Sequence, residues 1–234
     1  MYGLGLDSLL SVRIVIGTGE IVNASKESDP DLFWAVRGAG HNFGVVTSAT
    51  YRIYPLTNGG VVQNADLLLA SAQAGYVFKT FQRLRENNDF LPPELAVIAA
   101  IVFSPETGEA AVLVNLTYSG PVDKFNNLAQ PFLDLNPIVQ NMQTFPSNKA
   151  VQLAAFGVDS LTRVKGHPHS VFGANVKIDV ATWTEVFRKT NALFKETPAA
   201  RGSSVVLEMY NPEVMMSVPE EHTAWPWRDA KGYA

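Results

Sequence analysis

A glycine-rich segment of seven residues, Gly38-Ala39-Gly40-His41-Asn42-Phe43-Gly44, carries the clearest chemistry in the sequence. Glycine allows positive φ and close approach of a ligand, and the backbone N–H groups of such a loop can hold a phosphate. The spacing differs from the dinucleotide pattern G-x-G-x-x-G, because Phe43 occupies the sixth position and a strand follows instead of a helix. The segment indicates either a site for an anionic cofactor or a plain helix-to-strand turn.

Two side chains at the end of the last predicted strand form a second candidate site. Glu208, on an inward strand face, could act as a general base, and Tyr210 could hydrogen-bond a substrate carbonyl. The alternatives are a solvent-facing Glu208 near Pro212 and Glu213, and a half-buried Tyr210 that only packs. The residues alone leave both interpretations open.

Other catalytic or ligating patterns are weak. His167-Pro168-His169 places two imidazoles close together, but a zinc site needs further ligands and none lies nearby in the sequence. No metal is therefore expected. The chain has no cysteine, which excludes disulfides and cysteine-ligated clusters. It also lacks the nucleophile elbow of serine hydrolases and the P-loop.

Composition restricts the class of protein. The 234 residues are 47% hydrophobic and carry a formal net charge of −4, which suits a globular protein and disfavours a nucleic-acid binder. The longest apolar run, residues 95–103, is far shorter than the ~20 residues of a membrane-spanning helix. We expect a small-molecule substrate, with no nucleic acid and no membrane partner. No secretory signal is visible, so the location is open, with the cytoplasm as the default expectation.

The elements expected around the glycine-rich segment are short. Residues 11–16 and 20–24 predict a hairpin around Gly17-Thr18-Gly19. A helix should begin at Pro30, with Ser28 or Asp29 as its cap, and end at Gly38. Its apolar face should hold Leu32, Phe33 and Val36. A strand is expected over residues 45–54, stopped by Pro55, and residues 57–60 form the best internal boundary.

Beyond this boundary, strands and amphipathic helices are mixed. Strands are expected over 61–69, 95–103, 110–118, 171–178 and 203–210, and helices over 72–85, 122–133 and 182–194. Neighbouring strands with helices between only some of them predict an α+β fold with a mostly antiparallel sheet backed by helices.

Residues 29–47 read DPDLFWAVRGAGHNFGVVT, and this run resembles the signature of berberine-bridge-enzyme-like FAD-linked oxidoreductases, flavoproteins of the vanillyl-alcohol-oxidase or PCMH type. Residues 2–9 and 11–25 resemble the segments that precede this signature in the family. Residues 207–210 and 224–228 resemble two later family segments. The resemblance is strong over residues 1–57 and rests mainly on the order of motifs over 58–222.

The resemblance implies a fold in three stretches. Residues 1–57 would be a partial, second-half FAD-binding subdomain, residues 58–222 a substrate-binding α+β domain, and residues 223–234 the start of a segment that returns to the flavin domain. It also implies that Glu208 is a catalytic base or acid, with Tyr210 beside it. The residues that would approach FAD are Gly3, Leu4, Gly40, Asn42, Phe43, Gly44 and Val46.

The family's pyrophosphate-binding loop and its flavin-linking His and Cys have no counterpart before Met1, and the family's last segment has none after Ala234. The resemblance therefore predicts a chain truncated at both ends, with FAD held non-covalently if at all. A partial domain should also expose sheet edges through which chains associate.

Three functions stay open on the sequence. The first is FAD-linked oxidation of a small metabolite in natural-product biosynthesis, impaired by the missing flavin-linking region. The second is a flavin-free cyclase or isomerase that uses Glu208 and Tyr210. The third is a non-catalytic fragment or binding module. The resemblance favours the first.

Overall fold

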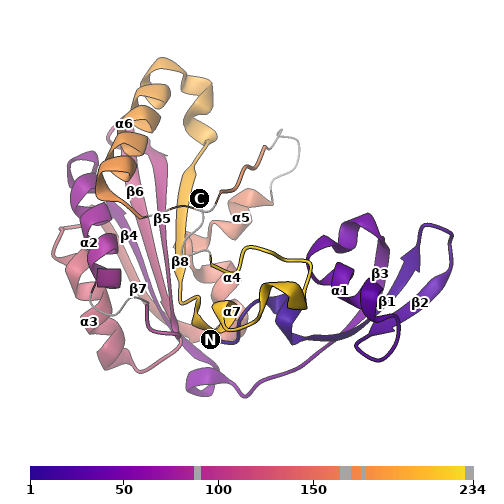
Figure 1. The fold of residues 1–234 in the computed structure, drawn as a ribbon. Helices are drawn as coiled ribbons and strands as arrows, with labels where there is room; N and C mark the ends of the chain where they lie inside the picture. The colour runs from indigo at the N-terminus through magenta and orange to yellow at the C-terminus, as the bar shows by residue number, and fades with distance from the viewer. Residues whose placement is uncertain (87–90, 164–169, 175, 177, 230–234) are drawn as a thin grey trace. The chain divides into compact units, whose positions relative to one another are not determined.

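The computed structural model describes residues 1–86, 91–163, 170–174, 176 and 178–229, and it separates into two compact units (Figure 1). Unit 1 contains Met1–Pro55 and the segment that begins at Pro212, and unit 2 contains Leu56–Asn211. The change of unit comes directly before Thr57–Gly60, where Asn58 and Gly59 both have positive φ. Each unit has its own core.

Unit 1 is built on a three-stranded antiparallel sheet of order β2-β1-β3. Its strands are β1 (Leu9–Ile16), β2 (Ile21–Ser25) and β3 (Gly44–Tyr51). The predicted hairpin is confirmed, because β1 and β2 pair antiparallel around residues 17–20. β3 ends three residues earlier than predicted, at Tyr51. It forms one edge of the sheet, and Val45 (69% exposed) and Tyr51 (52% exposed) are open to solvent.

Helix α1 (Pro30–Ala39) packs its apolar face on this sheet. Phe33 is buried with residues of β1, and Leu32 and Val36 pack against the same cluster, as predicted. The predicted side-chain cap is wrong. Asp29 adopts the left-handed conformation (φ 47°) and makes no capping bond, while the Ser28 hydroxyl donates to the carbonyl of Asn23.

The later segment of unit 1 contains the short helix α7 (Glu213–Met216). Hydrogen bonds join this segment to α1. Trp34 Nε1 donates to the Glu221 carbonyl at 2.8 Å, and Arg37 Nη2 donates to the His222 carbonyl at 2.9 Å. Beyond them, Arg228 forms an ion pair with Asp7. The segment predicted to return to the first domain from residue 223 is thus in contact with α1 from residue 221.

Unit 2 contains a five-stranded antiparallel sheet of order β7-β4-β6-β5-β8. The strands are β4 (Val61–Leu69), β5 (Leu95–Ser104), β6 (Glu109–Tyr118), β7 (Val139–Pro146) and β8 (Val205–Tyr210). Four of them lie within two residues of the predicted bounds. Their alternation of buried and accessible residues produces two distinct sheet faces.

Three helices cover one face of this sheet (Figure 1). They are α2 (Ala74–Glu86), α3 (Val122–Leu133) and α6 (Val180–Glu196), all close to the predicted ranges. The largest fully buried side chains of this layer are Phe78, Phe81, Phe125, Phe132 and Phe194. The predicted α+β fold, with an antiparallel sheet backed by helices, is confirmed.

The strand predicted over residues 171–178 is wrong for its described residues, which belong to no strand. Val171 and Phe172 are 91% and 89% exposed. The fifth strand is instead β7, which pairs with β4 from Val139 to Pro146. Its polar residues suit an edge strand with one accessible side, so its sequence lacks the apolar pattern of a buried strand. The short helices α4 (Ala150–Leu153) and α5 (Asp159–Thr162) follow it.

Candidate functional sites

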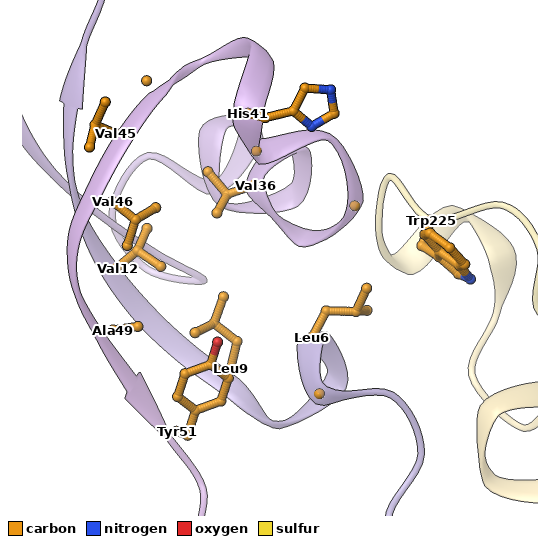
Figure 2. A pocket seen from close by; sticks show the side chains of 14 residues that line it. Leu6, Leu9, Val12, Val36, His41, Val45, Val46, Ala49, Tyr51 and Trp225 are labelled. Atoms are coloured by element: carbon orange, nitrogen blue, oxygen red, sulfur yellow. The ribbon is translucent and has the colours of Figure 1, made fainter. Parts of the chain in front are cut away.

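Unit 1 contains a cavity of about 780 Å³ between the glycine-rich segment, the sheet and the first turn of the chain (Figure 2). Its walls are mainly apolar. The polar groups of the wall are the side chains of His41 and Tyr51 and backbone groups. The lining residues are Gly5, Leu6, Leu9, Val12, Val36, Gly38, Gly40, His41, Gly44, Val45, Val46, Ala49, Tyr51 and Trp225. A cavity of this size and composition is typical of small-molecule sites.

The glycines that line this cavity differ in whether the surrounding structure leaves room for a side chain. Gly38 (φ 140°) and Gly44 (φ 153°) are required by the fold, because a Cβ would lie 2.5 Å from Trp225 N and 2.1 Å from the Val15 carbonyl oxygen, respectively. Gly40 has ordinary φ, and its Cβ would meet only Val36, at 3.5 Å. Around Gly5 a Cβ would meet nothing within 4 Å. The packing of the chain thus does not require glycine at positions 5 and 40. At these two positions, the lack of a side chain keeps the cavity open.

The residues expected to approach FAD divide into two groups. Gly40, Gly44 and Val46 line the cavity. Gly3, Leu4, Asn42 and Phe43 do not, and the N–H of Leu4 already donates to Asp7 Oδ2 at 3.1 Å. Sequence reasoning missed the contributions of Gly5 and Leu6, which directly follow the expected pair. The spacing alone could not show which side of this turn faces the cavity.

Among the described residues, no lysine or arginine belongs to the cavity lining. Two buried arginines of unit 1 bind other groups of the protein. Arg228 pairs with Asp7, and Arg37 donates to the carbonyls of Phe33 and His222. Burial lowers the pKa of Arg37, against the opposing effect of Asp7. The described lining therefore offers apolar surface for a flat ring, and backbone N–H groups with the side chains of His41 and Tyr51 for an anion.

Glu208 and Tyr210 lie on the face of the unit 2 sheet that the three helices leave free. The register aligns Glu208 with Ile98, Ile98 with Asn115, and Asn115 with Asp66. The neighbouring row, Leu207 with Ala99, Val114 and Leu67, is buried under the helices. Since side chains alternate between faces, Glu208 points away from the helical layer, and its side chain is exposed, as in the solvent-facing alternative and not on an inward strand face. Tyr210 follows on the same face and is half-buried.

Sequence reasoning missed a buried polar network on this face. Asn115 Nδ2 donates to Asn64 Oδ1 at 2.8 Å and to Asp66 Oδ1 at 2.7 Å. Asn64 and Asp66 are fully buried and Asn115 is 3% exposed. Thr117 Oγ1 donates toward Asn115 Oδ1 at 3.1 Å. The signal in the sequence was the alternation of polar with apolar residues in two otherwise apolar strands.

The remaining sequence candidates are outside these two sites. His167 and His169 lie outside the described residues. Among the described residues, no group of three His, Cys, Asp or Glu side chains could hold a metal ion. None of the described helices is long and apolar enough to cross a membrane.

Comparison with known proteins shows which proteins this sequence resembles. No family model matches the chain. The FAD-linked oxidoreductase srdI of Neurospora crassa is 35% identical over 235 residues, which cover 100% of this chain and 46% of that protein. The FAD-linked oxidoreductase fogF of Aspergillus ruber is 34% identical over 236 residues, 100% of this chain and 47% of that protein. The chain spans about half the length of the curated relatives it matches.

Solved structures identify the fold. BBE-like #28 from Arabidopsis thaliana matches 99% of this chain and 47% of its own, with a TM-score of 0.73 and 21% identity. The xylooligosaccharide oxidase from Myceliophthora thermophila matches 97% of this chain and 49% of its own, with a TM-score of 0.65 and 22% identity. The chain is thus similar in sequence to about half of a FAD-linked oxidoreductase, and its fold matches about half of a berberine-bridge-enzyme-like structure.

Proposed function

We propose that the chain serves a FAD-linked oxidation of a small metabolite, with FAD held non-covalently in the cavity of unit 1. The observation that carries the proposal is the cavity itself, because the segment that resembles the flavoprotein signature forms its wall. The relatives that match the whole chain are named FAD-linked oxidoreductases, which supports the same cofactor.

The cavity residues fit one part of FAD. Leu9, Val12 and Val46 offer apolar surface for a flat ring, and the bare backbone at Gly5 and Gly40 allows close approach. With no lysine or arginine among the described lining residues, the diphosphate would be held by backbone N–H groups together with His41 and Tyr51. Bound FAD supplies an acceptor for a hydride from a substrate C–H bond.

In this proposal residues 1–57 act as a partial FAD-binding subdomain and residues 58–222 as the substrate domain, and the segment from 223 returns to the flavin domain. Glu208 would take a proton from the substrate, because its exposed carboxyl group lies on the free face of the sheet. Tyr210, on the same face, would orient the substrate through a hydrogen bond. The exposed edge strand β3 would be the place where chains associate.

An absorbance spectrum of the purified chain tests the proposal. The protein is measured as isolated, and again after incubation with excess FAD and desalting. We expect flavin bands that stay with the protein. A folded protein that remains colourless under both conditions contradicts FAD-linked oxidation by this chain.

A flavin-free cyclase or isomerase that uses Glu208 and Tyr210 is the second candidate. It is favoured by the cavity lining, whose described residues include no lysine or arginine to neutralise a diphosphate. A substrate conversion that proceeds without flavin and is lost in Glu208→Gln would support it.

A further inference from the structure

Asp66 connects the sheet of unit 2 to a distant turn. Its side chain is fully buried, and none of the ion pairs among the described residues includes it. A buried carboxyl group is costly unless it is hydrogen-bonded. Asp66 Oδ1 accepts one hydrogen bond from Asn115 within the sheet and one from the backbone N–H of Ala155, at 2.8 Å. The second bond joins residues 89 positions apart.

The turn held by this bond has a strained backbone. Ala155, Phe156 and Gly157 have φ values of 53°, 56° and 71°, three successive residues in the left-handed region. Residues with a Cβ rarely adopt this conformation, and such strain persists only where the surroundings fix it. Strained backbone is concentrated at active sites and ligand clamps. The hydrogen bond from Ala155 to Asp66 joins this turn to the sheet.

The turn places an accessible apolar surface on the face of the sheet that carries Glu208. It packs against β4 and β6. The row from Glu208 through Ile98 and Asn115 to Asp66 crosses three strand spacings, about 14 Å. Phe156 is 40% exposed, and its neighbours Leu153 and Val158 are 38% and 42% exposed. An aromatic side chain therefore lies near one end of the row and a carboxyl group lies at the other.

We propose that Asp66 is a positioning residue that holds the 155–157 turn so that Phe156 forms an aromatic wall of the substrate site. The site then selects an elongated aromatic substrate, with one ring on Phe156 and its reacting end near Glu208. This inference rests on the proposed function in one respect, since it takes the free face of the sheet as the substrate face. It does not depend on whether FAD is bound.

Hydrogen exchange in the full chain tests the positioning step. In Asp66→Ala we expect the amide of Ala155 to lose its protection while the amides of Val205–Tyr210 keep theirs. Asp66 Oδ2 has no hydrogen-bond partner among the described residues, so Asp66→Asn can keep both bonds to Oδ1 and should retain the protection. Unchanged protection of Ala155 in Asp66→Ala overturns the positioning role.

Binding of 4-phenylphenol and of phenol to the flavin-free chain tests the aromatic wall, with calorimetry as the measurement. We expect Phe156→Ala to weaken binding of the two-ring compound about tenfold and to change phenol binding little. Phe172→Ala, which removes another exposed phenylalanine of unit 2, is the control and should change neither. Asp66→Ala should reproduce the loss seen in Phe156→Ala, and Asp66→Asn should not.

Equal affinities for Phe156→Ala and the unaltered chain overturn the inference, as does a chain that fails to bind 4-phenylphenol. Because Phe156→Ala and Phe172→Ala alter exposed side chains, this comparison does not depend on whether Asp66→Ala folds. Failure of FAD uptake, measured by absorbance, contradicts the proposed function alone. Failure of the two-ring preference contradicts the inference alone.

Discussion

Arg228 and Asp7 form a buried, bidentate ion pair within unit 1. Arg228 Nη2 and Nη1 donate to Asp7 Oδ1 and Oδ2 at 2.8 and 3.1 Å, across 221 positions of sequence. The side chains are 2% and 11% exposed. Arg228 also donates to Thr223 Oγ1 and to the Met215 carbonyl. One guanidinium group thus connects the first turn of the chain to the segment that begins at Pro212.

Asp7→Ala should destabilise unit 1 strongly. The change leaves the Arg228 charge buried without its partner, which typically costs about 3–5 kcal/mol of unfolding free energy. Urea unfolding followed by tryptophan fluorescence measures the loss. The control is Arg163→Ala, which breaks an exposed ion pair with Asp159 and should have little effect. Equal stabilities of Asp7→Ala and the unaltered chain would refute the structural role of this pair.

Two glycine substitutions should separate folding from cofactor binding. Gly44→Ala places a Cβ against the Val15 carbonyl at positive φ, and should cost about 2–4 kcal/mol of unfolding free energy. Gly40→Ala meets only Val36 and should change stability by no more than about 0.5 kcal/mol. If FAD occupies the cavity, the new methyl group of Gly40→Ala should still reduce FAD uptake. Retained flavin absorbance that matches the unaltered chain would place the cofactor elsewhere.

Asp179 should make helix α6 sensitive to acid. Hydrogen bonds from the side chain and backbone of Thr182 lower the pKa of Asp179 below its ordinary value of 3.8. Because the folded-state pKa is lowered, the stabilisation is fully present above the ordinary value and is lost as pH falls through the lower folded-state value. The difference in unfolding free energy between the unaltered chain and Asp179→Ala should therefore shrink in this acidic range. In Asp179→Asn the new side chain can cap the helix without ionising. Its contribution to the unfolding free energy should therefore not vary with pH.

The sequence predicts the elements of unit 2 best where one strong pattern decides them. Residues 61–69 and 122–133 have the predicted bounds, because apolar residues at both ends of the first stretch and a helical period in the second define them. β7 was missed because it is an edge strand with polar residues. The cap at Asp29 failed because that residue takes a left-handed backbone conformation, which local preference does not reveal.

The candidate sites were predictable only in part, for a similar reason. A period of two places Glu208 and Tyr210 on one face of a strand, so their common face follows from the sequence. The contact of Asp66 with Ala155 joins a side chain to a backbone N–H group 89 positions away, and no spacing rule anticipates it. The same holds for Gly38, whose requirement for glycine comes from the packing of Ala224 and Trp225.

Glu208→Gln should abolish most of the proposed oxidation without altering flavin binding. The amide keeps the shape of the side chain but cannot accept the substrate proton, so kcat should fall about 100-fold or more. KM should change little, because Glu208 acts in the reaction step rather than in binding. Glu106→Gln, at an exposed turn of the same unit, is the matched control and should leave kcat unchanged. Steady-state oxygen consumption, with O₂ as the expected electron acceptor of the reduced flavin, gives kcat and KM, and the flavin spectrum gives flavin binding. A Glu208→Gln chain with full kcat would remove Glu208 from the mechanism and leave Tyr210 as the remaining predicted group on that face.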